Sequence, residues 1–286
     1  MRIDAHVHFW KPACGFDNRP IADHAAYRRD FLPADLMPDL DACGIDGAIL
    51  VQAAPQSEET DWCIDLARDE PRIFGVTAWV NLDGPLVDYR ALLERPKVVG
   101  IRAQLRRIED TTFITRRSVV TNLAAALAAG LNVTVLAEAR HYPHVAAVLA
   151  TLPPGPVTIN HLALPFPEVD RAEWRLALRD VAHRPATFVQ LSGLPFLFKE
   201  RWREADARSL LDDALDILGP RRMLFASDYP MLLRFAAYGE WVQYVDEYLA
   251  ARRLTADESA AVMAGNAREA NPRLDVPRTA TARVAF

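Results

Sequence analysis

Residues 98–137 read VVGIRAQLRRIEDTTFITRRSVVTNLAAALAAGLNVTVLA, and this stretch sets the architecture that the sequence predicts. The apolar runs over residues 98–105 and 131–137 have the length of buried strands. Between them, residues 117–129 form a longer apolar segment that ends at Gly130, a residue that favours a helix stop. The stretch therefore predicts strand, helix and strand, the unit that connects two parallel strands.

The same alternation extends through most of the 286 residues. Strands are predicted at residues 2–9, 47–52, 73–82, 98–105, 131–137, 157–161, 187–192 and 223–228. Helices are predicted at residues 33–43, 57–68, 85–93, 117–129, 142–149, 167–182, 203–218, 240–252 and 256–268. Eight strand-helix units are typical of a TIM-type (β/α)8 barrel of about 250 residues. We therefore expect one α/β domain over residues 1–271 and a C-terminal tail over residues 272–286.

Charge and composition limit the classes of partner that the protein is expected to bind. The net charge of -5 offers no general surface for nucleic acid. Residues 119–137 carry no charge, but polar residues and Gly130 interrupt them, so we expect a buried helix and strand and no membrane contact. Three cysteines without a C-x-x-C spacing argue against a zinc ribbon. The opening MRIDAHVHFW has no secretory apolar region, so we expect a cytoplasmic protein that binds a small molecule, with self-association left open.

Histidines and an aspartate stand where predicted strands end. His6 and His8 lie two residues apart and share one face of the first strand, His161 ends the sixth, and Asp228 ends the eighth. A single buried histidine is more often structural than chemical. In a barrel, however, the carboxyl ends of all strands meet on one face, where catalytic groups lie. We therefore predict that these four residues form the catalytic set.

A second group of residues predicts substrate contacts. Arg102 lies inside an apolar run, and a buried guanidinium needs a carboxylate or a bound anion. We expect a small anionic lactone or carboxylic acid near Arg102, with its apolar part against Trp10, Phe196 or Phe198. The predicted substrate-binding residues are Trp10, Arg102, Gln104, Arg106, Arg107, Ser192 and Phe196.

Several motifs carry a family resemblance. They are IDAHVHFW at residues 3–10, GIR at 100–102, NHLALP at 160–165, QLSGL at 190–194, ASDYP at 226–230 and MAGNARE at 263–269. In this order they resemble the amidohydrolase superfamily, and more narrowly the amidohydrolase-2 branch that includes 2-pyrone-4,6-dicarboxylate lactonase and sugar-acid lactonases. The resemblance implies a distorted (β/α)8 barrel and a hydrolase that opens a cyclic ester.

Two differences from other branches bear on the cofactor. Lys97 precedes the fourth strand, so it cannot be the carbamylated lysine of binuclear members, and the fifth strand ends in Leu136, Ala137 and Glu138 instead of a histidine. The resemblance then implies a lactonase with no required metal. His6, His8 and His161 would hydrogen-bond the scissile carbonyl and Asp228 would activate water, which matches the base and the donors that ester hydrolysis needs.

Two alternatives keep the same residues. One divalent ion, Zn²⁺ or Mn²⁺, would bind His6, His8, His161 and Asp228, with Glu138 completing the site of a metal-dependent hydrolase or decarboxylase. In the weaker alternative, the barrel binds a small acid without turnover. Metal analysis with activity before and after chelation separates the first alternative from a metal-free lactonase.

Overall fold

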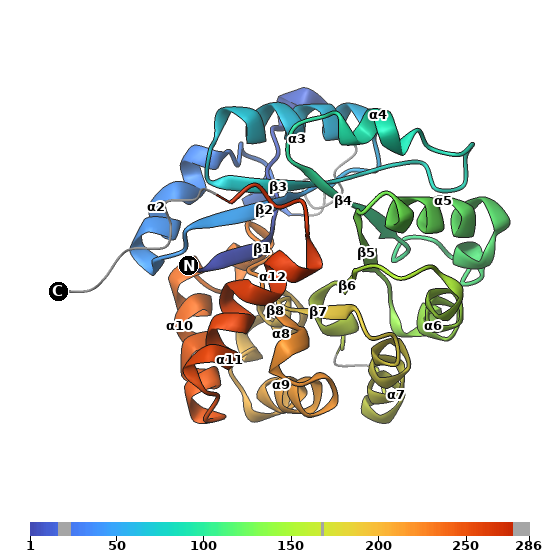
Figure 1. The fold of residues 1–286 in the computed structure, drawn as a ribbon. Helices are drawn as coiled ribbons and strands as arrows, with labels where there is room; N and C mark the ends of the chain where they lie inside the picture. Colours follow the sequence, from blue (N-terminus) through green and yellow to red (C-terminus); the bar gives the residue numbers. More distant parts are fainter. Residues whose placement is uncertain (17–23, 167–168, 277–286) are drawn as a thin grey trace.

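The chain forms a parallel barrel in a computed structural model that describes residues 1–16, 24–166 and 169–276. Eight strands pair in sequence order, and each pair is parallel. The strands are β1 Ile3–Val7, β2 Gly47–Val51, β3 Ile73–Ala78, β4 Val98–Gln104, β5 Asn132–Leu136, β6 Val157–Ile159, β7 Thr187–Leu191 and β8 Met223–Phe225. A parallel bridge between Val7 and Tyr229 brings the first and last strands together, so the barrel is nearly closed (Figure 1).

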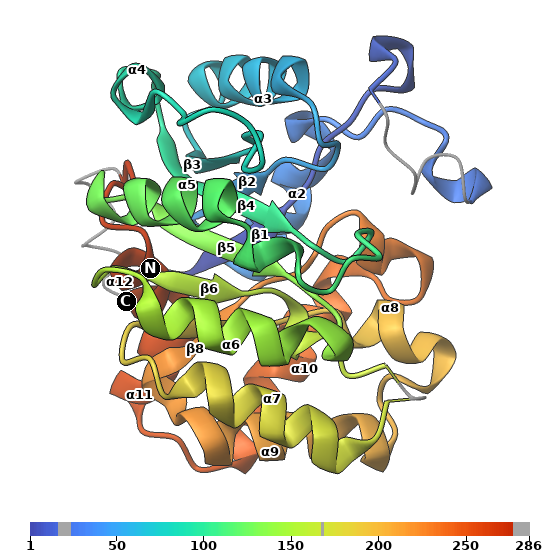
Figure 2. The ribbon, with the colours of Figure 1, turned by 90° about the vertical axis from the view of Figure 1, so that its right-hand side faces the viewer.

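Helices surround the strands on the outside (Figures 1 and 2). They are α2 Pro33–Cys43, α3 Ser57–Asp69, α4 Tyr89–Leu93, α5 Arg117–Ala128, α6 Tyr142–Thr151, α7 Arg171–Ala182, α8 Leu194–Phe198, α9 Ala205–Leu218, α10 Tyr238–Ala251, α11 Ala256–Ala260 and α12 Asn266–Ala270. In α5, the buried residues Val119, Leu123, Ala126 and Leu127 recur at helical spacing and place one apolar face on the barrel. This packing confirms the single-domain TIM-type barrel that the alternation predicts.

The amino-terminal end of the barrel is closed by the last helix and the chain after it. Apolar side chains from inside the barrel, among them Phe74 and Phe188, pack against Ala267 and Ala270 of α12. Leu274 joins this cluster, and the backbone N–H of Asp275 donates to the carbonyl oxygen of Phe74 (2.9 Å). The first residues predicted as a tail thus pack under the barrel, and residues 277–286 lie outside the described residues. The opposite, carboxyl-terminal end is left for the site.

Element boundaries differ from the predicted ones where a polar side chain caps a helix. Helix α4 begins at Tyr89, not at residue 85, because the Asp88 side chain accepts the N–H of Ala91 (3.1 Å). Helix α7 begins at Arg171, because Asp170 accepts the N–H of Glu173 (2.9 Å), while residues 167–168 lie outside the described residues. Helix α8 was not predicted, since five residues are too few for a helical repeat.

The structure bears on the expectations about membrane contact and about the cysteines. In the described part of the chain, no helix is both long and apolar enough to cross a bilayer. Cys14, Cys43 and Cys63 are free thiols.

The end of α10 offers a test of backbone strain. Arg253 follows this helix with φ +56°, in the left-handed region that Gly44 and Gly130 occupy after α2 and α5. Because a side chain is disfavoured in this region, we expect Arg253→Gly to raise the free energy of unfolding by about 0.5–1 kcal/mol. Thermal unfolding measures the gain. Ala251→Gly, within the helix, is the matched control and should lower stability, and equal losses in both variants would contradict the account.

Candidate active site

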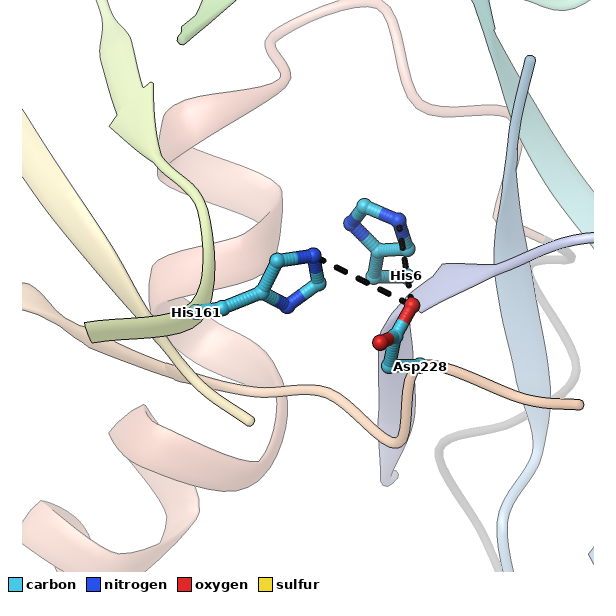
Figure 3. A group of neighbouring side chains, drawn as sticks. All are labelled: His6, His161 and Asp228. Atoms are coloured by element: carbon cyan, nitrogen blue, oxygen red, sulfur yellow. Dashed lines mark ion pairs between the residues drawn. The ribbon is translucent and has the colours of Figure 1, made fainter. Parts of the chain in front are cut away.

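Four side chains meet at the carboxyl-terminal end of the barrel. Asp228 Oδ1 lies 3.8 Å from His6 Nε2, 3.6 Å from His8 Nε2 and 3.9 Å from His161 Nε2. All four residues are buried. Figure 3 shows His6 and His161 directed at the same carboxylate oxygen. The structure therefore brings together the whole predicted catalytic set, from strands that are far apart in the sequence.

A buried aspartate joins the strands that carry His6 and Asp228. Asp4 Oδ1 accepts the backbone N–H groups of His6 (3.1 Å) and Ser227 (2.9 Å), and Asp4 Oδ2 accepts the hydroxyl of Tyr238 (3.0 Å). The backbone N–H of Asp228 also donates to the carbonyl oxygen of His6 (3.0 Å). These bonds replace regular pairing between β1 and β8, so they fix the distance between His6 and Asp228.

His161 stands in a strained turn. Residues 161–164 all have φ between +49° and +63°, which costs roughly 1–2 kcal/mol for each side chain in this region. The turn is held by its own hydrogen bond from Leu164 N to His161 O (2.8 Å) and by the Trp174 indole, which donates to Leu162 O (2.7 Å). Asp228 is also left-handed, at φ +60°. Strain of this kind persists where the surroundings enforce it, commonly at functional sites.

Gly193 leaves room for the His161 ring. A Cβ at position 193 would lie 2.9 Å from the Cβ of His161, and Gly193 has φ +87°. We expect Gly193→Ala to lower the melting temperature and to weaken divalent-cation binding, because His161 must move. Thermal unfolding with and without ZnCl2 measures both effects. Gly239→Ala is the matched control, since its Cβ would meet only Cys43 Sγ at 3.5 Å, and a Gly193→Ala variant that behaves like it would contradict the steric argument.

The outer ring nitrogens orient the histidines. His8 Nδ1 donates to the carbonyl oxygen of Val51 (2.6 Å). Gln190 donates its amide N–H to Ala5 O (3.2 Å), so its Oε1 faces His6 and accepts from His6 Nδ1 (2.9 Å). His161 Nδ1 pairs with the Ser192 hydroxyl (2.8 Å). In all three residues Nδ1 is bound outward, which leaves Nε2 for the centre of the site.

Burial keeps these rings neutral. It lowers the pKa of His8 to about 3 and the pKa values of His6 and His161 well below their usual range, with nearby charges adding to the effect. Neutral rings that donate from Nδ1 carry a lone pair on Nε2. His6 Nε2 and His8 Nε2 nevertheless lie only 2.9 Å apart, so two lone pairs face each other. A cation beside both nitrogens would turn this repulsion into attraction.

The Asp228 carboxylate also favours a bound cation. Burial raises the pKa of Asp228 to about 8, although Arg102 and Arg106 act in the opposite direction. An additional positive charge near Oδ1 would favour the ionised form at neutral pH. Donor atoms of His6, His161 and Asp228 lie within 4.8 Å of one another, and nitrogen with carboxylate oxygen suits Zn²⁺ or Mn²⁺. The donor set therefore fits one divalent cation.

Glu138 does not take part in this donor set. Its carboxylate faces Arg106 (3.4 Å) and Arg140 (3.1 Å) instead. The hypothesis that Glu138 completes a metal site is therefore not supported by the geometry.

A hollow opens above the four residues. It is lined by His8, His161 and Asp228 and by most of the predicted substrate-binding residues: Trp10, Arg102, Gln104, Arg106, Arg107 and Phe196. Ser192 lies behind His161 as its hydrogen-bond partner, and Phe198 lines a different hollow. Leu136, Leu164, Leu197 and Met231 add an apolar wall that the sequence did not predict.

Arg102 is buried without a carboxylate in direct contact among the described residues. Its Nη1 donates to Gln52 O (3.0 Å) and its Nε to Asn160 Oδ1 (3.2 Å). Burial lowers its pKa to about 10, so the guanidinium stays charged at neutral pH. Glu59 and Asp228 are the buried acids nearby, and Glu59 accepts the backbone N–H groups of Ala53 and Ala54 (2.6 Å to Ala54). Arg102 thus keeps a positive charge at the wall of the hollow.

Sequence analysis did not predict some residues that support the site. Asn160 donates to Gln190 Oε1 (2.6 Å), so a buried amide pair stands behind His6. Glu59 lies on α3. It accepts the backbone N–H groups of residues 53 and 54, a contact that no sequence pattern predicts. The alternation of Gln190 with Ser192 on one strand face was the available signal for the amide pair.

Comparisons with known proteins find similar chains over nearly the whole length. An L-fucono-1,5-lactonase of Burkholderia multivorans strain ATCC 17616 is 34% identical over 282 residues, which cover 93% of this chain and 94% of that protein. The same name belongs to a protein of Burkholderia ambifaria that is 31% identical over 281 residues, with 93% and 94% covered. A 2-pyrone-4,6-dicarboxylic acid hydrolase structure from Pseudomonas putida shares the fold, at 19% identity and a TM-score of 0.72, with 93% and 96% covered.

One similar structure corrects the expectation about metal. A crystal structure of an amidohydrolase from Burkholderia multivorans with bound zinc has 34% identity and a TM-score of 0.86, and covers 94% of this chain and 98% of that one. Together with the clustered donor atoms of His6, His161 and Asp228, it contradicts the expectation that no metal is required. The absence of the strand-five histidine misled the prediction, because His6, His8, His161 and Asp228 already supply enough donors.

A family model for amidohydrolases matches residues 3–270, nearly the whole described barrel. The match covers all the motifs that suggested the resemblance, from the paired histidines of β1 to the closing helix. With its barrel and its strand-end histidines and aspartate, this chain belongs to the amidohydrolase family, in the amidohydrolase-2 branch.

Proposed function

We propose that this chain is a lactonase that opens a small sugar-acid lactone with the help of one divalent cation. The observation that carries the proposal is the pair of facing Nε2 atoms of His6 and His8 beside the buried carboxylate of Asp228. The relatives named as L-fucono-1,5-lactonases support the same reaction.

His6, His8, His161 and Asp228 would hold the cation. When bound, a zinc or manganese ion supplies Lewis acidity to the ester group that reacts. The chain's own contribution is to keep the three rings neutral by burial and to orient them through Val51, Gln190 and Ser192. Because their Nδ1 hydrogens are already donated, His6 and His8 are better suited to bind a cation than to donate to a carbonyl.

Asp228 is the candidate base. Its Oδ1 faces the histidines, while its Oδ2 has no hydrogen-bond partner among the described residues, and Asp228 lines the hollow. Oδ2 is therefore placed to accept a proton from the attacking water and to return it to the ring oxygen that leaves. Water adds to the carbonyl carbon, the ester C–O bond breaks, and the product is a hydroxy acid.

Arg102 and Arg106 would bind a carboxylate of the substrate or of the product. A fuconolactone is neutral until it opens, and opening creates a carboxylate. Arg102 and Arg106 line the hollow beside Asp228, so they are placed to attract a carboxylate that the substrate carries or that the product gains. The apolar wall of Leu136, Leu164 and Met231 suits the unsubstituted face of a ring.

A lactone panel tests the proposal. Ring opening releases acid, so a pH indicator follows it for L-fucono-1,5-lactone, other six-membered sugar lactones and 2-pyrone-4,6-dicarboxylate, with the cation-loaded full chain. We expect saturable opening of at least one sugar lactone. No opening of any lactone, combined with small acids that still raise the melting temperature, would support the non-catalytic alternative.

The finer expectations about location and assembly stay predictions. We propose a cytoplasmic enzyme and leave its oligomeric state to light scattering. Two similar structures, a 5-carboxyvanillate decarboxylase and a dihydroxybenzoic acid decarboxylase, are 14% and 12% identical and share the fold alone, so they do not favour decarboxylation.

A further inference from the structure

A second hollow adjoins the active site. The two hollows share three lining residues, Arg102, Gln104 and Arg107. The second hollow has a cavity volume of about 230 Å³, so there is room for a further group beyond the reacting centre. Its other walls are Pro55, which follows β2, and residues of the chain that follows β3 and β4, which are neighbouring strands (Figure 1). A single lactone ring over Asp228 leaves this second space unfilled.

The lining of the second hollow suits a neutral, hydroxylated ring. Outside the three shared residues, it contains no charged side chain: Pro55, Trp79, Val80, Asn81, Leu82, Ile108 and Phe113. The two positively charged side chains, Arg102 and Arg107, therefore lie at the boundary with the active site. An additional carboxylate would find no partner in the far part, which argues against a substrate with two distant acid groups.

Two aromatic rings and two amides face this space. Trp79 and Phe113 are half-buried, and they present the apolar faces on which the C–H surface of a sugar packs. The Trp79 indole N–H and the side-chain amides of Asn81 and Gln104 have no hydrogen-bond partner within the described ranges, which leaves donors and acceptors for hydroxyl groups.

The segment that carries Trp79 and the Phe113 ring are both anchored. The backbone N–H of Trp79 donates to the Thr60 hydroxyl (3.0 Å), which ties the chain at the end of β3 to α3. The Arg116 guanidinium lies 4.8 Å from the centre of the Phe113 ring and pairs with Asp83 and Asp110. The backbone at Trp79 and the ring of Phe113 are thus positioned before a ligand arrives, which lowers the entropy that binding costs.

From these observations, we infer that the second hollow is a subsite for another sugar ring. The substrate class is the lactone of a disaccharide acid, in which the lactone ring lies over Asp228 and a glycosyl substituent lies against Trp79 and Phe113. This inference rests on the proposed lactonase function, and it names the substrate of that same site.

The test compares lactones that share one reacting ring. D-glucono-1,5-lactone is measured beside the 1,5-lactones of cellobionic, maltobionic and lactobionic acids, which carry an additional sugar. The cation-loaded wild type, Trp79→Ala and Phe113→Ala are compared, with Trp62→Ala as the control for loss of a half-buried tryptophan away from both hollows. L-fucono-1,5-lactone reports on the basic reaction.

We expect at least one disaccharide lactone to exceed the glucono lactone in kcat/KM by about tenfold, the effect of one well-packed aromatic contact. Trp79→Ala should remove this advantage and leave opening of the single-ring lactones within about twofold, while Trp62→Ala keeps the advantage. If the fucono lactone opens but no disaccharide lactone exceeds the glucono lactone, or if Trp79→Ala slows all lactones equally, the subsite is refuted and the lactonase function stands. If no lactone opens, both proposals fail.

Discussion

Replacement of Asp228 by asparagine is expected to lower kcat/KM for lactone opening by at least about 10³-fold, near the upper range for loss of a general base. The amide cannot accept the proton of the attacking water, and it is a weaker cation ligand than a carboxylate. Asparagine is tolerated in the left-handed region better than most residues, so φ +60° at this position should not destabilise the variant. Initial rates and thermal unfolding of the variant measure the two effects.

A surface aspartate provides the control. Asp41 pairs with Arg72 on the outside of the molecule, and Asp41→Asn makes the same chemical change far from the site. It should leave turnover unchanged. An Asp228→Asn variant that keeps activity within tenfold of wild type would show that Asp228 is not the base.

Divalent-cation binding is expected to stabilise the folded chain. At a free Zn²⁺ concentration of about 100 times its Kd, a ligand that binds only the folded state contributes about 2.7 kcal/mol, or about 5–10 °C in Tm for a chain of this size. The physical reason is the pair of facing lone pairs on His6 and His8, whose repulsion the cation removes. Thermal unfolding of the stripped protein with added ZnCl2 or MnCl2 measures the shift.

Histidine variants locate that effect. His6→Ala should abolish the shift, because it removes one donor and leaves Gln190 without its ring partner. His183→Ala, an exposed histidine on the outside of the barrel, should retain the full shift. A shift that survives His6→Ala would place the cation elsewhere.

The sequence predicted the barrel because helical and strand lengths alternate so regularly. The clustering of His6, His8, His161 and Asp228 was predictable for the same reason, since a barrel brings all strand ends to one face. Helix starts were less predictable, because they depend on single capping residues such as Asp88 and Asp170.

Residue types alone could not decide between a metal-free site and a metal-binding one. A missing strand-five histidine suggested a metal-free site, but the tautomers of His6 and His8 depend on Val51 O and Gln190, which only the three-dimensional arrangement shows. Likewise, Asp4 precedes the paired histidines in the sequence, yet its role in joining β1 to β8 requires the position of Ser227 and Tyr238. Contacts between residues that are far apart in the chain produce no pattern in the local sequence.

We propose above that this chain opens a sugar-acid lactone through a cation-dependent site. The most direct measurement is the initial rate of L-fucono-1,5-lactone opening by the same preparation as purified, after chelation, and after zinc or manganese is restored. The account predicts saturable opening that falls to about one hundredth or less on chelation and returns with the cation. Full activity in a protein with no measurable metal would contradict it.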